Sequence, residues 1–273
     1  MKIITNISDL RSTLNNYYNL NKKIALVPTM GSLHEGHLSL INFAQKKAEI
    51  VIVTIFINKA QFNDSNDFKL YPRNLENDIN KLAKLQPDII FAPDDSQIYD
   101  DDFAIKISVN KFNDCLCASS RLGHFDGVAL IITKLFNLIK PNIAIFGEKD
   151  FQQTLIIKKL VKDLNFDIEI ITMPTYREKS GLAMSSRNSR LSENGKKQAS
   201  LIYNALNEIR LNPLKIEQVK MQLLNNGFTK IDYLEIRRES DLKLINNLDS
   251  NEEKRIFIAI YLEGIRLIDN LKI

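Results

Sequence analysis

Several kinds of residue are scarce in this chain of 273 amino acids, and each scarcity excludes a class of function. Cysteine occurs twice, as Cys115 and Cys117, and histidine three times. A zinc site would therefore be short of ligands. A disulfide between such close neighbours would be strained, and a reducing cytosol disfavours it. We expect both cysteines to be ordinary thiols.

An excess of one charge is also missing. The chain has 37 Lys and Arg against 33 Asp and Glu, which gives a formal net charge of +4. The two signs are interspersed along the sequence. This mild balance argues against nucleic acid as a partner and suits an anionic small-molecule substrate.

Long apolar runs are absent as well. The clearest ones, residues 51–57 and 128–139, are well short of the roughly 20 residues that a membrane-spanning helix needs. The first residues lack the apolar core of a signal peptide. We therefore expect a cytoplasmic protein with no membrane partner, and the 44% hydrophobic and 26% charged residues are typical of a globular protein.

One stretch, residues 24–43 with the sequence IALVPTMGSLHEGHLSLINF, organises the chain. Its first four residues predict a buried strand, and Pro28 and Gly31 then break the pattern. Apolar spacing from His37 onward predicts a helix packed on a sheet. His34 and His37 lie where this helix begins, and a helix N-terminus offers unpaired N–H groups to phosphate. The stretch predicts a nucleotide site.

The two histidines are three residues apart, in the order His34-Glu35-Gly36-His37. A zinc-protease motif needs a spacing of four. An isolated pair could equally be two exposed loop histidines. A functional role is favoured because two of the three histidines share one strand-to-helix turn beside a glycine.

Strand and helix patterns alternate through the first 175 residues. Further strands are predicted at residues 50–57, 88–91, 105–109, 143–146 and 168–171, and helices at residues 75–85, 123–139 and 150–164, after a first helix capped by Ser8. This alternation predicts an α/β fold with a doubly wound, Rossmann-like parallel sheet. The loops at Pro28, Asn58 and Gly147 should converge at the carboxyl ends of its strands.

The pattern changes after Arg190, and the boundary between the two regions is expected in the loop at residues 173–190. Helices are predicted at residues 192–210 and 214–224, followed by strands at 230–237, 255–262 and 265–268. Consecutive strands with short connections indicate an antiparallel sheet. We expect a second, smaller α+β domain at residues 176–273.

The string PTMGSLHEGHLSLI, residues 28–41, resembles the signature of pantothenate synthetase, also called pantoate–β-alanine ligase. This family belongs to the His-x-Gly-His nucleotidylyltransferase superfamily. The resemblance implies ATP-dependent condensation of (R)-pantoate with β-alanine to pantothenate, AMP and pyrophosphate, through an enzyme-bound pantoyl adenylate. It also implies Mg2+ with ATP, a homodimer, a nucleotide- and pantoate-binding domain at residues 1–175, and a lid domain at residues 176–273.

Three further strings carry the resemblance: INKAQF at residues 57–62, FGEKDFQQ at 146–153 and REKSGLAMSSRN at 177–188. It implies catalytic roles for His34, His37, Lys149 and Arg187. It implies pantoate binding by Gln61 and Gln153 and β-alanine binding by Gln61. The implied ATP-binding residues are Met30, Gly31, Ser32, Leu33, His34, Glu35, Gly36, His37, Gly147, Glu148, Lys149, Asp150, Tyr176, Met184, Ser185, Ser186 and Arg187.

The sequence departs from the family pattern at a few of these places. Lys59 stands where proline is usual, which loosens the loop that carries Gln61. Tyr176 replaces a small aliphatic residue, so contact with ATP through its backbone is expected. Where the family usually has two acids, this chain has Asn77-Asp78. The sequence therefore does not decide whether the protein supplies a ligand to Mg2+. The string RLGHFDGV at residues 121–128 also resembles the family, and His124 within it can be structural or can contact substrate.

Two other functions are compatible with parts of the pattern. A different nucleotidylyltransferase would share the histidine motif but transfer AMP to a phosphorylated small molecule and stop there. A non-catalytic RNA binder derived from a synthetase would need a basic face, which the charge balance disfavours. Analysis of the products would distinguish the nucleotidylyltransferase from the ligase. A measurement of salt-dependent RNA binding would identify the RNA binder.

Overall fold

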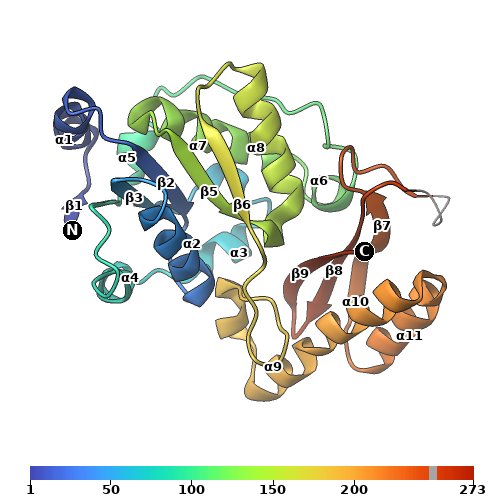
Figure 1. Ribbon diagram of the computed structural model, residues 1–273. Coiled ribbons are helices and arrows are strands. Elements are labelled where there is room, and N and C mark those ends of the chain that lie inside the picture. The colour runs from blue at the N-terminus through green and yellow to red at the C-terminus, as the bar shows by residue number, and fades with distance from the viewer. Residues whose placement is uncertain (246–250) are drawn as a thin grey trace. The chain divides into compact units, whose positions relative to one another are not determined.

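The computed structural model describes residues 1–245 and 251–273. Its larger sheet has six parallel strands in the order β1-β4-β3-β2-β5-β6 (Figure 1). The strands are β1 (Lys2–Ile4), β2 (Ile24–Thr29), β3 (Ile50–Ile55), β4 (Ile89–Phe91), β5 (Ile143–Gly147) and β6 (Glu169–Met173). This confirms the predicted doubly wound sheet. The strand order reverses between β2 and β5, where ligands bind in such folds.

Helices and short 3-10 turns connect these strands. They are α1 (Ile7–Asn19), α2 (Glu35–Gln45), η1 (Lys59–Gln61), α3 (Ser65–Lys69), α4 (Leu75–Leu82), α5 (Asp95–Ile98), α6 (Leu116–Ser120), α7 (His124–Ile139), η2 (Glu148–Asp150) and α8 (Phe151–Asp163). In β2, Ala25 and Val27 share a core with Ile41 of α2. The alternate residues Ile24 and Leu26 are equally buried. Both faces of the sheet are therefore covered, as a parallel sheet requires.

Pro28 lies near the point where the neighbouring strands β2 and β5 stop pairing. β2 pairs with β3 through Thr29, but its pairing with β5 ends at Leu26. Proline has no N–H to donate to a strand neighbour. Pairing with β5 thus ends before Pro28, whereas the chain stays paired with β3 until it leaves the sheet after Thr29.

Two local predictions were wrong. The cap of α1 is Asn6, not Ser8, because the Asn6 side chain accepts the N–H of Asp9 at 2.8 Å. Residues 105–109 form no strand. The N–H of Val109 donates to the carboxylate of Asp126 at 2.9 Å instead of to a neighbouring strand.

The smaller sheet is antiparallel, with the order β7-β8-β9, and confirms the predicted α+β region. Its strands are β7 (Lys230–Arg238), β8 (Lys254–Leu262) and β9 (Ile265–Lys272). The other elements are η3 (Ser186–Arg190), α9 (Glu193–Ala199), α10 (Leu201–Leu211), η4 (Pro213–Lys215) and α11 (Ile216–Asn225). Helices α10 and α11 pack on this sheet through buried residues such as Leu206, Val219 and Ile258.

The chain divides into two compact units. The first comprises Met1–Asn110, Leu122–Glu148 and Gln153–Pro174, and the second comprises Lys111–Arg121, Lys149–Gln152 and Thr175–Ile273. Two segments that the sequence assigned to the first domain thus cluster with the second unit. The buried Gln152 amide joins the two segments to each other, because it donates to the carbonyl groups of Phe112 and Cys115 at 2.8 and 2.9 Å. Side chains of β9 bond to both segments, since Asn270 donates to the carbonyl of Lys149 at 2.9 Å and Arg266 to Oγ of Ser120 at 3.2 Å.

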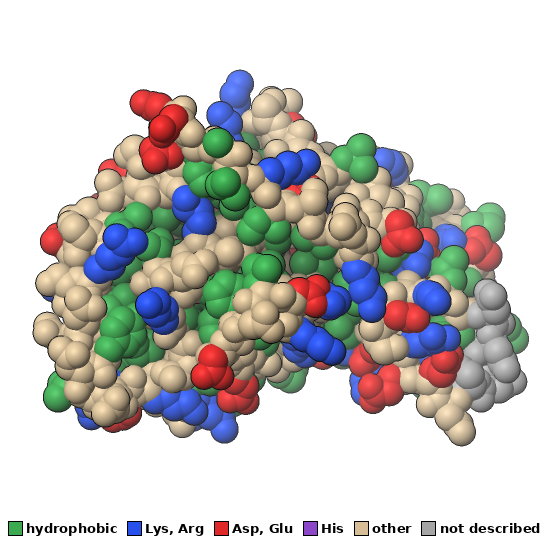
Figure 2. Space-filling view, turned by 90° about the horizontal axis from the view of Figure 1, so that it is seen from above, with side chains coloured by type: hydrophobic (Ala, Val, Ile, Leu, Met, Phe, Trp, Pro, Cys, Tyr) green, Lys and Arg blue, Asp and Glu red, His purple; other side chains and the backbone are tan. Residues whose placement is uncertain are grey.

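The described helices are all too short or too polar to cross a membrane. On the face drawn in Figure 2, basic and acidic side chains are interspersed among apolar and polar atoms. This surface agrees with the mild net charge of the sequence.

Candidate active site

The turn between β2 and α2 carries the two neighbouring histidines. Gly31 and Ser32 both have left-handed backbone conformations, with φ values of 75° and 50°. His34 is the N-cap of α2, and its ring centroid lies 4.0 Å from that of His37. The backbone N–H of His34 donates to Nδ1 of His37 at 3.3 Å. Because Nδ1 accepts, a neutral His37 ring carries its proton on Nε2, which is then a hydrogen-bond donor.

Two side chains of α4 hold this turn in shape. The Asp78 carboxylate is 1% exposed and accepts the N–H groups of Ser32 and Leu33, at 2.8 and 2.7 Å, one on each oxygen. The Lys81 ammonium donates to the carbonyl of Leu33 at 2.6 Å. A Cβ atom on Gly31 would lie 2.9 Å from Oδ2 of Asp78, so glycine permits this close approach. The turn is a preformed element that depends on α4.

The second motif follows β3 and ends in η1, whose last residue is Gln61. Nδ1 of His124 lies 2.7 Å from the carbonyl oxygen of Gln61. The buried Asn58 amide donates to Oε1 of Gln61 at 3.1 Å and to the carbonyl of Gly127 at 3.0 Å. A Cβ on Gly127 would collide with the backbone of η1, so glycine lets α7 touch this turn. Gln61 is thus held both at its backbone and at its side chain, although Lys59 stands where the family usually has proline. The contact of His124 with this backbone is a structural one.

The third motif joins β5 to α8. β5 ends at Gly147, and Lys149 follows in η2 with its side chain 17% exposed and Nζ 3.2 Å from the Asp150 carboxylate. Asn270 of β9 donates its Nδ2–H to the carbonyl of Lys149 at 2.9 Å. Lys149 and Asp150 belong to the second unit, whereas Gly147 and Gln153 belong to the first.

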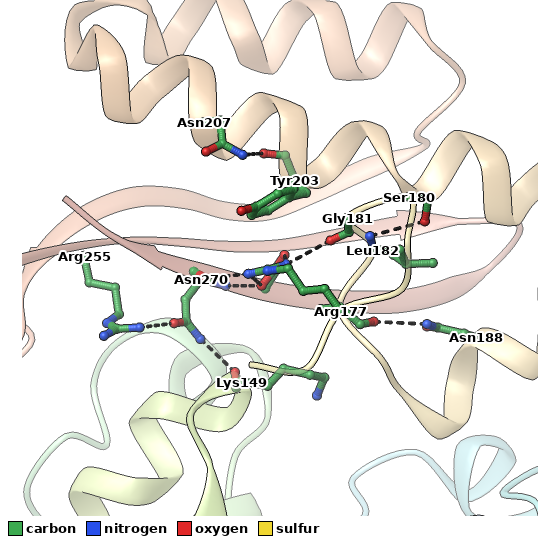
Figure 3. A network of polar contacts seen from close by, with 12 residues as sticks. Lys149, Arg177, Ser180, Gly181, Leu182, Asn188, Tyr203, Asn207, Arg255 and Asn270 are labelled. Atoms are coloured by element: carbon green, nitrogen blue, oxygen red, sulfur yellow. Dashed lines mark hydrogen bonds and ion pairs between the residues drawn. The ribbon is translucent and has the colours of Figure 1, made fainter. Parts of the chain in front are cut away.

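A buried ion pair attaches the loop after β6 to β9 (Figure 3). Arg177 donates to both oxygens of Asp269, at 2.6 and 2.9 Å. It also donates to the carbonyl groups of Gly181 and Asn270, and its guanidinium lies 4.1 Å from the ring centroid of Tyr203. Burial raises the pKa of the Asp269 carboxyl, although its hydrogen bonds with Arg177 act in the opposite direction. Desolvation offsets much of the attraction in such a pair, so its main effect is to fix the geometry of the loop.

The hydroxyl-rich part of that loop is shaped by its own backbone. The N–H of Met184 donates to the carbonyl of Tyr176 at 3.0 Å, and the Tyr176 side chain is 45% exposed. Ser185 is the N-cap of η3, and its Oγ accepts the N–H of Arg187 at 3.3 Å. Asn188, which is buried, donates to a carbonyl of the same loop at 3.0 Å. The segment that carries Arg187 is therefore an ordered turn.

The structure places the predicted ATP residues on three loops. Met30 to His37 lie on the β2–α2 turn, Gly147 to Asp150 between β5 and α8, and Tyr176 and Met184 to Arg187 on the loop after β6. Sequence reasoning missed Lys81, Asp269 and Asn270, which hold these loops, and gave no role to Arg177, although that residue lies in one of the motif strings. Asp78 was considered only as a metal ligand. A signal for it existed, since Asp78 lies four residues before the buried Leu82 and so is an acid on the inward face of α4.

Metal-ligand chemistry is sparse in the part of the chain that the structure describes. It contains no group of three or more His, Cys, Asp or Glu side chains that could hold a metal ion. Both oxygens of Asp78 already accept backbone N–H groups. The described residues therefore do not fit a Mg2+ site built by the protein alone.

Comparison with known proteins gives one consistent result. Residues 2–272 match the model of the family described as pantoate-beta-alanine ligase. A pantothenate synthetase from Acinetobacter baumannii is 44% identical over 281 residues, which cover 100% of this chain and 98% of that protein. The structure of pantothenate synthetase from Thermus thermophilus matches with a TM-score of 0.90 at 34% identity, covering 100% and 99% of the two chains. Pantoate-beta-alanine ligase from Francisella tularensis, complexed with Beta-gamma ATP and Beta-alanine, matches with a TM-score of 0.89 at 38% identity, covering 100% and 97%.

Proposed function

The chain belongs to the pantoate–beta-alanine ligase family, and we propose that it forms pantothenate in two steps through an enzyme-bound pantoyl adenylate. In the first step, the carboxylate of (R)-pantoate attacks the α-phosphorus of ATP and pyrophosphate leaves. In the second step, the amine of β-alanine attacks the acyl carbon, loses a proton and displaces AMP. Neither step needs a protein nucleophile, so catalysis consists of positioning and electrostatic stabilisation.

The observation that carries this proposal is the histidine pair on a preformed turn at the N-terminus of α2. The N–H groups and the positive dipole end of this helix favour phosphate. His37, with its proton on Nε2, can stabilise the phosphate oxygen on which charge builds as pyrophosphate leaves. We assign ATP binding to this turn, namely to Met30, Gly31, Ser32, Leu33, His34, Glu35, Gly36 and His37. Leu33 contributes by fixing the turn, since the residue is 1% exposed and its N–H and carbonyl bond to Asp78 and Lys81.

We also propose catalytic roles for Lys149 and Arg187, which both belong to the second unit. Lys149 supplies a compact positive charge for the triphosphate, and Arg187 a planar guanidinium that can donate to two oxygens at once. The contacts of β9 support these roles, because Asn270 holds the backbone of Lys149 and Asp269 holds Arg177 of the loop. The remaining ATP-binding residues that we propose are Gly147, Glu148, Asp150, Tyr176, Met184, Ser185 and Ser186.

The two acid substrates are assigned to glutamine side chains. We place pantoate on Gln61 and Gln153 and β-alanine on Gln61. Neutral amides can donate to carboxylate and hydroxyl oxygens without taking up a proton themselves. The rigid setting of Gln61 between Asn58 and His124 supports its part in this assignment.

Three further properties belong to the same proposal. Mg2+ enters with ATP as part of the substrate, coordinated mainly by phosphate oxygens and water. The protein works in the cytoplasm, which agrees with two cysteines that are free and buried. The resemblance to the family favours a homodimer, which light scattering coupled to size-exclusion chromatography would measure.

Product analysis tests the proposed reaction. With ATP labelled on the α-phosphorus, pantoate and β-alanine, the label should appear in AMP in a one-to-one ratio with pantothenate. Omission of pantoate should abolish AMP formation. Labelled ADP would indicate a kinase, and stable transfer of AMP to a phosphorylated acceptor would indicate another nucleotidylyltransferase.

A further inference from the structure

Tyr99 makes a hydrogen bond that the reaction scheme above does not use. Its hydroxyl donates to Oδ1 of Asn58 at 2.7 Å. The Tyr99 ring packs against Phe56 and Phe103, at centroid distances of 6.2 and 5.1 Å, and the ammonium of Lys134 lies 5.3 Å from its centroid. Burial raises the pKa of Tyr99 to about 12, so the phenol keeps its proton at neutral pH. The hydroxyl therefore keeps a proton that it can donate to Asn58.

The orientation of the Asn58 amide follows from its neighbours. The carbonyl of Gly127 can only accept, so the Asn58 nitrogen must face it, at 3.0 Å. The Asn58 oxygen then faces Tyr99, whose hydroxyl can supply the proton. Asn58 is 1% exposed, and reversal of its amide would bring two carbonyl oxygens together in a site screened from solvent.

The orientation of the Asn58 amide also determines the orientation of the Gln61 amide. Nδ2 of Asn58 also donates to Oε1 of Gln61 at 3.1 Å, so the oxygen of the Gln61 amide is turned toward Asn58. The Gln61 nitrogen is turned the other way and lies 3.2 Å from the sulfur of Met30. Thioether sulfur is a weak acceptor, and a carboxylate oxygen would be a stronger one.

We propose that Tyr99 is a positioning residue that acts through Asn58 to make Gln61 present N–H donors, and not its carbonyl oxygen, to the acid substrates. The inference rests on the proposed assignment of Gln61 to pantoate and β-alanine. It makes the hydroxyl of a residue outside the five motif strings a determinant of affinity for carboxylate substrates. ATP should be affected much less, because the chain reaches the ATP-binding turn only through the contact between the Gln61 nitrogen and the sulfur of Met30, a weak acceptor.

Tyr99→Phe tests the proposal, because it removes the hydroxyl and keeps the ring. We expect KM for pantoate and for β-alanine to rise about 3- to 30-fold, the scale of one lost hydrogen bond that leaves a buried acceptor unsatisfied. KM for ATP should stay within about twofold. Tyr18→Phe is the matched control, since that hydroxyl also donates to a partly buried oxygen in the same unit, the carbonyl of Ile139 at 2.6 Å. It should leave all three KM values unchanged.

A double-mutant cycle separates positioning from a general structural effect. If Tyr99 acts through Gln61, Tyr99→Phe should raise KM for pantoate in the wild-type background and have no further effect in Gln61→Ala. Equal effects in both backgrounds, a parallel rise in KM for ATP, or unchanged pantoate and β-alanine KM values in Tyr99→Phe would overturn the proposal.

A second variant tests the orientation of the amide without altering Tyr99. Gln61→Glu keeps an acceptor for Asn58 but has no N–H group to offer, so it should weaken pantoate binding at least as much as Gln61→Ala. Normal KM for pantoate in Gln61→Glu would overturn the proposal even if Tyr99→Phe failed to fold. Failure of the proposed function is a different result, because the wild-type protein would then form no pantoate-dependent AMP.

Discussion

Replacement of Asp78 by asparagine should deform the β2–α2 turn and slow adenylation. Each oxygen of the Asp78 carboxylate accepts one backbone N–H, from Ser32 or Leu33. Asparagine has one acceptor oxygen, so its NH2 group would face the other N–H, donor against donor. The loss of a charge-assisted hydrogen bond, with a buried N–H left unsatisfied, costs about 2–4 kcal/mol. About 1.4 kcal/mol corresponds to tenfold in rate. When part of this cost adds to the activation free energy of adenylation, kcat should fall about 10- to 100-fold.

Asp88→Asn is the matched control for this experiment. The Asp88 carboxylate accepts the N–H of Val51 at 2.8 Å, but it lies beside the amino ends of β3 and β4, at the opposite edge of the sheet. Urea titration should show a lower free energy of unfolding for both variants. In a single-turnover assay of AMP formation, Asp78→Asn alone should be slow. Equal rates for the two folded variants would refute the idea that the shape of the turn limits adenylation.

Three other changes test separate parts of the structure. His37→Ala should lower kcat by about 100-fold or more with a smaller change in KM for ATP, and near-normal turnover of a folded variant would remove His37 from the mechanism. Gly127→Ala should lower the urea midpoint strongly, because its Cβ would collide with the backbone of η1; an unchanged midpoint would contradict that packing. Burial alone would raise the pKa of Asp232, but hydrogen bonds from Lys230 and Arg266 hold that pKa below its usual value. The stabilisation from Asp232 is therefore present above about pH 4 and lost as pH falls through the folded-state pKa, so wild type should lose more unfolding free energy between pH 5 and pH 3 than Asp232→Asn.

The main sheet was predictable because its strands are short, continuous apolar runs. Residues of β3 from Ile50 to Val53 are all buried, and such a run indicates a parallel strand with both faces covered. The prediction failed at residues 105–109, where apolar and polar residues alternate equally well. Ile105 is 67% exposed there. Alternation reports β-propensity, but a strand also needs a neighbour to pair with, which a single segment of sequence does not reveal.

The candidate site was predictable only in its motifs. The turn with His34 and His37 and the Lys149 segment were visible because glycine and charged residues follow apolar runs. The residues that hold them were not visible, because their contacts join distant parts of the chain. Asp78 bonds to residues 45 and 46 positions away, and Asn270 reaches a carbonyl 121 positions away. A lone acid or asparagine carries no local pattern that reports such a partner.

Exchange of labelled pyrophosphate into ATP tests the central claim most directly. The pantoate carboxylate is already ionised at neutral pH and needs no base, so the first step should be reversible on the enzyme. With pantoate present and β-alanine absent, label from pyrophosphate should enter ATP, and addition of β-alanine should convert the adenylate to pantothenate and AMP. Exchange that does not depend on pantoate, or pantothenate formation without any pantoate-dependent exchange under these conditions, would contradict a pantoyl adenylate intermediate.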